Sequence, residues 1–374
     1  MINLIIKLTY FIFRLLPIKR TNILFIGYYG SQYGCSPKYL SQYFSKNDKN
    51  IKITWAFTQP QKYNIESIIP IRYYSLRYFY ELATSKVIIT NYRLPEYFKK
   101  RNKQFYIQTW HSSLRLKMIE NDTVNTLPES YVKMAKYDSS QIDLLLSGCK
   151  FSSEIFKRAF WYNGEIFECG TPRCDIFFQQ NESIIKSIKE RIGLKSEDKI
   201  LLYAPTFRKG NNLSAYDIDF NRLLSVLNQQ GNWKVLIRLH PHLQEYSADL
   251  VKNNDSIIDV TKHDDIQELL LISDLLISDY SSLVFDFAIT KKPCVLYTSD
   301  LEEYLKKDRN LYFNIYELPF PICRNNNELI ETIKSFDIEK YIIALNKFNL
   351  KIGSFEYGNA SKRVYDKVIQ IINK

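Results

Sequence analysis

The chain has 374 residues, of which 45% are hydrophobic and 24% are charged, and it contains no low-complexity tract. This composition argues against a disordered chain and suits a globular, enzyme-like protein with two domains of ordinary size, each with its own core. The formal net charge is +11, from 51 Lys and Arg against 40 Asp and Glu. Such an excess favours an anionic partner, namely nucleic acid, an acidic membrane surface or a phosphate-rich substrate, although a compositional bias toward Lys, Asn and Ile explains it equally well.

The first twenty residues carry the one local membrane signal. Lys7 and Arg14 interrupt their apolar run, which therefore falls short of the roughly 20 apolar residues of a spanning helix. No small-residue cleavage site follows, which argues against a secretory signal. We expect residues 1–20 to form an amphipathic helix that lies on an anionic membrane surface. The alternative is a terminal helix that packs on the protein's own core.

Short buried strands alternate with helical stretches through the rest of the chain. The predicted strands are residues 23–26, 51–57, 86–90, 105–109, 144–146 and 166–168, followed by 200–203, 235–239, 275–277 and 295–297. Amphipathic helices are predicted near residues 219–230 and 325–335. This alternation predicts parallel sheets.

The same pattern predicts a domain organisation. We expect an N-terminal Rossmann-like domain at residues 21–180 and a C-terminal Rossmann-like domain at residues 181–357. The polar segment 181–198 is the expected hinge. A closing helix at residues 358–374 is expected to pack back on the first domain. Two such domains facing a central cleft give an α/β fold of the GT-B type, which nucleotide-dependent transferases adopt.

Two absences narrow the choice of chemistry. The chain has neither a G-x-G-x-x-G dinucleotide fingerprint nor a G-x-x-x-x-G-K-[ST] phosphate loop, so a dehydrogenase or a P-loop enzyme loses its main support. The six cysteines are scattered without a C-x-x-C pair. They indicate buried thiols in a reducing cytosol and argue against a zinc site.

The strongest functional signal is the polar turn that follows the strand at residues 275–277. It reads Ser-Asp-Tyr-Ser-Ser and contains Asp279, Ser281 and Ser282. In open α/β sheets ligands bind at the carboxyl ends of the strands, and two hydroxyls beside the N–H groups of a following helix suit a phosphate. The alternative is simple N-capping of that helix.

Two histidines stand at matching strand ends. His111 follows the strand at residues 105–109, and His240 follows the strand at residues 235–239, with Arg238 just before it. A histidine, with an ordinary pKa near 6.5, accepts a proton from an attacking hydroxyl or carries positive charge beside a phosphate. For either histidine alone, a structural hydrogen-bonding role at a strand end explains the sequence equally well. The matching positions of the pair favour a catalytic or phosphate-binding role.

Two further turns add anion-binding capacity. Thr206, Arg208 and Lys209 follow the first strand of the second half, and Arg173 and Asp175 follow the last strand of the first half. The planar guanidinium group of arginine suits phosphate oxygens. Each turn taken alone is equally well a solvated loop, so it is their convergence that predicts an anion site.

These residues also carry a family resemblance. The motifs QTWHSSLRLK, GTPRCDIF, LLYAPTFR, RLHP, DIQELLLISDLLISDYSSLVFDFA, DLEEY and GNASKRV occur in this order. They resemble the successive motifs of the CDP-glycerol glycerophosphotransferases that prime and polymerise teichoic acids, and the chain length resembles that of the primase-like members. The resemblance implies a GT-B fold, CDP-glycerol as donor, and peripheral attachment to the cytoplasmic face of the bacterial plasma membrane. It also implies that the domain at residues 21–180 is the acceptor side and that the domain at residues 181–357 binds the CDP-linked donor.

The resemblance also implies roles for individual residues. His111 would be the general base that deprotonates the acceptor hydroxyl, and His240 with Arg238 would hold the donor phosphate. Asp279, Ser281 and Ser282 would contact the donor pyrophosphate or its surroundings, and Arg208 would add positive charge. The acceptor hydroxyl would attack the β-phosphorus and release CMP. No carboxylate cluster for a metal stands out, so we expect no cofactor beyond loosely bound magnesium.

One motif departs from the family pattern, and several alternatives stay open. Ser112, Ser113 and Leu114 stand where the family commonly has Gly-Thr-Pro, which changes the backbone freedom beside the proposed base. The donor is then CDP-glycerol or CDP-ribitol, and the acceptor is a membrane-embedded lipid-linked molecule or a capsular or other surface polysaccharide. A GT-B sugar-nucleotide glycosyltransferase and a non-catalytic binder of anionic polymers are the other classes. Nucleic acid is not an expected partner, because no recognised binding module is present.

Overall fold

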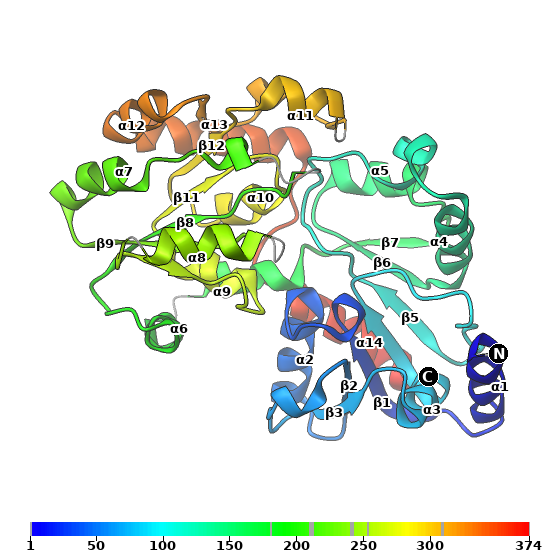
Figure 1. The fold of residues 1–374 in the computed structure, drawn as a ribbon. Coiled ribbons are helices and arrows are strands. Elements are labelled where there is room, and N and C mark those ends of the chain that lie inside the picture. Colours follow the sequence, from blue (N-terminus) through cyan, green and yellow to red (C-terminus); the bar gives the residue numbers. More distant parts are fainter. Residues whose placement is uncertain are drawn as a thin grey trace. The chain divides into compact units, whose positions relative to one another are not determined.

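The computed structural model describes residues 2–179, 182–208, 213–239, 243–252, 254–307 and 310–373. The chain divides into two compact units, each built around its own parallel sheet (Figure 1). Unit 1 comprises Met1–Ser113, Ile119–Ile176 and Gly353–Lys374, and unit 2 comprises Leu114–Met118 and Phe177–Ile352. The carboxyl-terminal helix therefore belongs to the first unit, and five residues of the first half belong to the second.

Unit 1 contains a seven-stranded sheet in the order β3-β2-β1-β4-β5-β6-β7, with every neighbouring pair parallel. The order reverses at β1, from which the chain proceeds first to one edge and then to the other. This is the topological switch point at which open α/β sheets bind ligands. The strands are β1 (Lys19–Ile26), β2 (Lys52–Phe57), β3 (Ile69–Arg72), β4 (Ser85–Thr90), β5 (Phe105–Gln108), β6 (Leu144–Ser147) and β7 (Glu165–Glu168).

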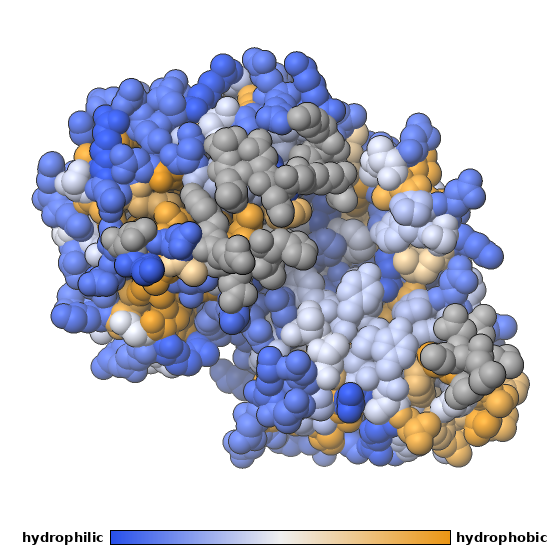
Figure 2. Space-filling model, in the orientation of Figure 1, coloured by the Kyte–Doolittle hydropathy of each residue, from blue (hydrophilic) through white to orange (hydrophobic). Residues whose placement is uncertain are grey.

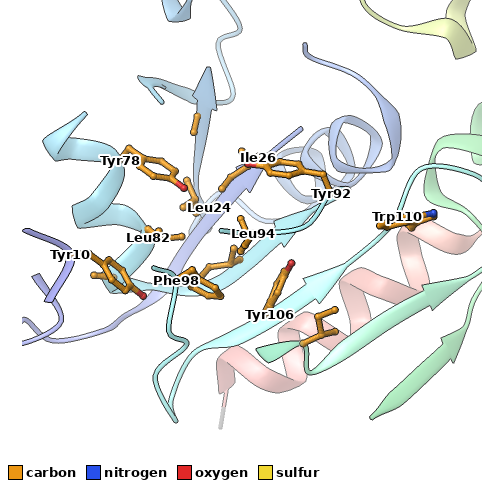
Figure 3. Close-up of a cluster of buried hydrophobic side chains, with 14 of the residues drawn as sticks. Tyr10, Leu24, Ile26, Tyr78, Leu82, Tyr92, Leu94, Phe98, Tyr106 and Trp110 are labelled. Atoms are coloured by element: carbon orange, nitrogen blue, oxygen red, sulfur yellow. The ribbon is translucent and has the colours of Figure 1, made fainter. Parts of the chain in front are cut away.

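Helices cover both faces of this sheet, because alternate strand residues point to opposite sides. On one face, Phe25, Trp55 and Ile89 pack with side chains of α2 and α14. On the other face, Leu24 and Ile88 pack with side chains of α1, α3 and α5. Figure 3 shows part of this tyrosine-rich cluster, with Tyr10 of α1 and Tyr78 of α3. The helices of unit 1 are α1 (Ile2–Phe13), α2 (Cys35–Asn47), α3 (Leu76–Thr84), α4 (Glu129–Gln141), α5 (Lys150–Ala159) and α14 (Ala360–Asn373).

Unit 2 contains a six-stranded parallel sheet in the order β10-β9-β8-β11-β12-β13, which reverses at β8. The strands are β8 (Lys199–Tyr203), β9 (Trp233–Ile237), β10 (Ile257–Asp259), β11 (Leu275–Ser278), β12 (Cys294–Tyr297) and β13 (Ile322–Cys323). The helices are α6 (Glu182–Ile192), α7 (Phe220–Leu227), α8 (Gln244–Lys252), α9 (Ile266–Ile272), α10 (Leu283–Ala288), α11 (Leu301–Lys307), α12 (Asn326–Lys334) and α13 (Ile338–Ile352). One face of the sheet packs on the apolar sides of α7 and α12.

The prediction of two Rossmann-like, parallel-sheet domains is confirmed. All ten predicted strands are present, whereas β3, β10 and β13 were not predicted. These three have only two to four residues each and lie at the ends of the sheet orders, where the apolar pattern is weakest. The six cysteines are buried, as expected, and form no disulfide with one another. The boundaries between the units fall at Phe177 and Gly353, slightly before the expected positions.

The amino-terminal helix is shorter than expected, since α1 ends at Phe13 and β1 already begins at Lys19. One side of α1 packs on the core of unit 1: Tyr10 is 2% exposed, and its hydroxyl donates to the Lys99 carbonyl over 3.0 Å. The side chains of Leu8, Phe11 and Ile12 are exposed. No helix in the described part of the chain has both the length and the apolar character needed to cross a bilayer.

Candidate active site

The turn that carries His111 is fixed by the conformation of the residue before it. Trp110 has a φ of +53°, in the left-handed region that residues with a side chain rarely adopt. Its N–H donates to Oε1 of Gln108 over 2.9 Å, and its ring stacks on the His111 imidazole with centroids 4.4 Å apart. These contacts hold the exposed imidazole in one orientation at the carboxyl end of β5.

A hydrogen bond sets the tautomer of His111. Its Nδ1 lies 3.1 Å from the main-chain oxygen of Asn91, directly after β4. Because a carbonyl oxygen only accepts hydrogen bonds, Nδ1 carries the proton and Nε2 carries the lone pair. The imidazole therefore has the proton-accepting nitrogen that a general base requires, and the Asn91 carbonyl stabilises the cation formed after proton transfer.

Arg173 braces the same turn. Its side chain comes from the turn after β7, and the residue is only 4% exposed. Nη1 donates to the His111 carbonyl over 2.6 Å and to Sγ of Cys35, at the start of α2, over 3.2 Å. The structure thus brings together two of the predicted site residues, His111 and Arg173.

Asp175, from the same motif, has a different role. Its two carboxylate oxygens accept the N–H groups of Ala360 and Ser361 over 3.0 and 2.7 Å, so it caps the start of α14. Burial raises the pKa of this carboxyl group, and the cap hydrogen bonds oppose that rise. Asp175 therefore fastens the carboxyl-terminal helix to unit 1.

A buried ionic network, which we did not predict, lies beside the Trp110 ring that stacks on His111. The Arg93 guanidinium group lies 3.2 Å from Asp138 and 3.3 Å from Glu120, 3.6 Å from the ring centre of Phe160 and 5.7 Å from that of Trp110. Burial raises the pKa of Asp138 to about 6, although Arg93 and three donated hydrogen bonds lower it. The polar turn after the strand at residues 86–90 is the sequence signal that points to Arg93.

In unit 2, Asp279 organises the polar turn after β11. Its carboxylate accepts the Thr206 N–H over 2.8 Å and the Tyr280 N–H over 2.6 Å, and it lies 2.8 Å from Nη2 of Arg208. A single buried carboxylate thereby joins the turn after β8 to the turn after β11. Three predicted residues, Thr206, Arg208 and Asp279, are brought together.

Arg208 is not an isolated cation. Its Nε lies 2.5 Å from Asp300, and its guanidinium carbon lies 4.9 Å from the ring centre of Tyr280 and 5.1 Å from that of Tyr304. Burial lowers the pKa of Arg208, but the two carboxylates outweigh burial and raise it overall. The charge of Arg208 is thus engaged with Asp279 and Asp300. Asp300 and Tyr304 are the first and last residues of the DLEEY motif. That motif is the sequence feature that points to them as site residues.

The two serines of the polar turn have different partners. Ser281 Oγ accepts the Leu283 N–H over 3.4 Å, a weak contact of the capping kind. Ser282 is the N-cap residue of α10, but its hydroxyl oxygen does not cap that helix. It accepts the Leu116 N–H over 3.1 Å. Helix capping therefore explains at most the contact of Ser281. The hydroxyl of Ser282 instead connects the turn to a distant part of the sequence.

That part of the sequence is the segment Leu114–Met118, here named the hook, which belongs to unit 2. The Met118 N–H donates to the Asn310 carbonyl over 2.9 Å, and the Leu116 carbonyl accepts the Tyr312 N–H over 2.8 Å. Lys117 forms an antiparallel bridge with Leu311. The hook continues the motif that contains His111, and nothing local in the sequence indicates that it docks on the second domain.

Arg238 donates from Nη1 to the His263 carbonyl over 2.6 Å, and Nε2 of His263 lies 2.9 Å from Glu268. Arg238 therefore stands at the carboxyl end of β9, as predicted, and is supported from the turn before α9. His240 and Lys209 lie outside the described residues. Among the residues that the structure describes, no group of three or more His, Cys, Asp or Glu side chains is arranged to hold a metal ion.

Comparison with known proteins gives consistent matches over nearly the whole chain. The family model of CDP-glycerol:poly(glycerophosphate) glycerophosphotransferases matches residues 8–370. The teichoic acid poly(glycerol phosphate) polymerase of Bacillus spizizenii is 32% identical, over 98% of this chain and 97% of that protein. The teichoic acid ribitol-phosphate primase of the same organism is 29% identical, over 94% of this chain and 92% of that protein.

A solved structure agrees. The wall teichoic acid polymerase TagF, in a histidine-to-asparagine variant soaked with CDPG, matches with a TM-score of 0.88 and 30% identity, over 98% of this chain and 94% of that chain. The predicted GT-B-type α/β fold is confirmed by this match, while the cleft between the domains stays a prediction. Sequence motifs, sheet topology and these matches lead to one conclusion: the chain belongs to the CDP-glycerol:poly(glycerophosphate) glycerophosphotransferase family.

Proposed function

We propose that the protein transfers glycerol phosphate from CDP-glycerol to a hydroxyl group of a lipid-linked acceptor in teichoic acid synthesis and releases CMP. The observation that carries the proposal is the orientation of His111, whose Nδ1 proton is committed to the Asn91 carbonyl so that Nε2 is the proton-accepting nitrogen. Family membership supplies the donor class.

His111 acts as the general base in unit 1. Nε2 takes the proton of the acceptor hydroxyl as the oxygen forms a bond to the β-phosphorus of the donor. The bond between that phosphorus and the bridging oxygen breaks, and CMP leaves with the electron pair. Positioned base catalysis of this kind contributes about 10²–10⁴ in rate.

The polar turns of unit 2 hold the donor. The Ser281 and Ser282 hydroxyls, Arg238 and His240 bind the donor phosphates, since charge grows on the phosphoryl oxygens and on CMP as the reaction proceeds. Arg208 shapes this site through its buried pairing with Asp279.

The proposal includes attachment to the cytoplasmic face of the plasma membrane through the amino-terminal helix. Leu8, Phe11, Ile12, Leu15 and Leu16, in and just after α1, are between 40% and 77% exposed. Figure 2 shows hydrophobic side chains gathered where α1 lies in Figure 1. Arg14, Lys19 and Arg20 border them and complement anionic headgroups, so that the helix lies on the surface beside a lipid-linked acceptor.

Vesicle sedimentation tests this attachment. The wild type is expected to sediment with phosphatidylglycerol vesicles and to do so more weakly with phosphatidylcholine vesicles. Replacing Phe11 and Leu15 by Ser is expected to abolish sedimentation. The same change at Ile343 and Leu350, which are equally exposed on α13, serves as the matched control and should have no effect. Equal sedimentation of both double variants would rule out α1 as the anchor.

A donor panel tests the reaction. Purified protein is incubated with a lipid-linked acceptor and with CDP-glycerol, CDP-ribitol or a UDP-sugar, and nucleotide release is followed. We expect CMP release from CDP-glycerol that depends on the acceptor. Preferred turnover of CDP-ribitol would select the ribitolphosphotransferase, for which the 29% identity to a ribitol-phosphate primase is the specific support. Release of UDP would select a glycosyltransferase.

A further inference from the structure

The hook connects the proposed base to the phosphate-binding turn along a very short stretch of chain. Unit 1 ends its first segment at Ser113, the hook belongs to unit 2, and the chain re-enters unit 1 at Ile119. Only Ser112 and Ser113 separate His111 from the hook. Neither serine is among the described residues with a positive φ, so the loss of the family's usual Gly-Thr-Pro creates no left-handed strain here.

Both ends of this stretch are held. In unit 1, the His111 carbonyl accepts Nη1 of Arg173 over 2.6 Å, and the Ser113 carbonyl accepts the Ser152 hydroxyl over 3.0 Å. In unit 2, the hook pairs with residues 310–312 through two main-chain hydrogen bonds, which form the antiparallel Lys117–Leu311 bridge. Only two residues lie between His111 and the hook, so the chain has little slack between the hook and the base turn.

Ser282 of the polar turn contacts the hook through its hydroxyl group. Its oxygen accepts the Leu116 N–H over 3.1 Å. A hydroxyl has one donor hydrogen besides its acceptor lone pairs, so the same group can donate to a phosphate oxygen while it holds Leu116. Donation to an anion strengthens the acceptor character of the oxygen, since hydrogen bonds in a chain polarise one another.

The hook also reaches the cluster around Arg208. Nζ of Lys117 lies 5.4 Å from the centre of the Tyr304 ring, which stacks on Tyr280 with centroids 3.8 Å apart and also faces Arg208. The position of the hook therefore depends on the same aromatic and ionic cluster that shapes the donor turn.

We propose that Ser282 is a positioning residue that couples donor binding to the placement of His111, with the hook as the coupling element. The inference rests on the proposed function. A donor phosphate at the polar turn tightens the Ser282–Leu116 hydrogen bond and fixes the hook, and the fixed hook holds the base turn in its reactive position. Without the bond, a bound donor no longer fixes the hook, and the base is poorly aligned.

The test compares Ser282→Ala, Ser282→Thr and the matched control Ser225→Ala, whose hydroxyl bonds only within α7 on the surface of unit 2. Hydrogen–deuterium exchange of peptides covering residues 111–118 is measured with and without CDP-glycerol. Binding of CDP-glycerol is measured by calorimetry, and kcat and its pH profile by CMP release.

In the wild type and in Ser225→Ala, CDP-glycerol is expected to protect residues 111–118. Ser282→Ala is expected to bind CDP-glycerol more weakly, because one phosphate contact is lost. At saturating donor it is also expected to lose the protection and to lower kcat on the order of tenfold to a hundredfold with an altered pH profile. Ser282→Thr keeps the hydroxyl and should restore most of the protection and rate.

Two results would overturn the coupling. One is retained protection of residues 111–118 in Ser282→Ala, and the other is weaker donor binding with an unchanged kcat, which would make Ser282 a phosphate contact only. Failure of the wild type to bind CDP-glycerol or release CMP would instead overturn the proposed function, so the two failures are distinguishable.

Discussion

The buried contact between Arg208 and its two carboxylates gives the sharpest stability prediction. The side chains of Arg208, Asp279 and Asp300 are only 5%, 3% and 10% exposed. Removing one partner of a buried pair costs about 3–5 kcal/mol, because it leaves an uncompensated charge. Asp279→Asn keeps an oxygen that accepts the N–H groups, and Arg208 remains paired with Asp300. We therefore expect the free energy of unfolding to fall by about 3 kcal/mol, near the lower end of that range.

For a domain of this size each kcal/mol shifts Tm by about 2–4 °C, so the expected drop is about 10 °C. Arg208→Met leaves two carboxylates facing one another and should be more destabilising. Adding Asp279→Asn to Arg208→Met removes that repulsion, so the double variant should be more stable than Arg208→Met alone, with a coupling energy of about 2 kcal/mol.

Calorimetry and urea unfolding of the four proteins measure this cycle. Arg222→Met, which removes an exposed arginine that bonds Asn327, is the control and should change stability by less than about 0.5 kcal/mol. The reasoning would be refuted if the effects of the two substitutions were additive, and if Arg208→Met were as stable as the wild type but bound CDP-glycerol more weakly. Arg208 would then be a phosphate ligand rather than a buried structural cation.

Three further predictions concern pH, capping and metal. Burial raises the pKa of Asp138 to about 6 in the folded protein, so ionisation of this carboxyl group opposes folding. Between pH 4 and pH 7, the free energy of unfolding of the wild type should therefore fall by up to about 3 kcal/mol relative to that of Asp138→Asn. A difference between the two proteins that does not change with pH would contradict this. Asp175→Ala should cost about 1–2 kcal/mol and speed amide exchange in α14, and Asp175→Asn should cost less; unaltered exchange in the alanine variant would disprove the cap. Brief EDTA treatment followed by buffer exchange should leave CMP release intact, and its abolition with recovery on adding Mg²⁺ would establish a required ion.

Much of the fold follows from local pattern. Nine of the ten predicted strands contain a run of three or more apolar residues, and the strand at residues 166–168 contains two. Parallel strands place the turns that follow them at one edge of a sheet. This is why His111 and Arg173 could be assigned to one sheet edge, and Thr206 and Asp279 to another, before any contact was known. The edge strand β13, with two residues, has too little pattern to be found.

The partners of the site residues could not be predicted in the same way. Arg208 pairs with Asp300, 92 positions away, and the hydroxyl of Ser282 meets Leu116, 166 positions away. Such contacts depend on how loops from different strands pack, which neither hydrophobic period nor turn chemistry encodes. Charge alone predicts that Arg208 binds phosphate. The structure adds its buried pairing with Asp279 and Asp300, and contact with a phosphate stays a prediction.

The most direct test of the account is CMP release by His111→Ala, measured beside its affinity for CDP-glycerol. The account predicts a kcat lowered by about 10²–10⁴, with CDP-glycerol bound as in the wild type, because the imidazole acts on the acceptor hydroxyl and the donor is held by unit 2. A variant that turns over at the wild-type rate, or that loses donor binding to the same extent as turnover, would contradict the assignment of His111 as the base.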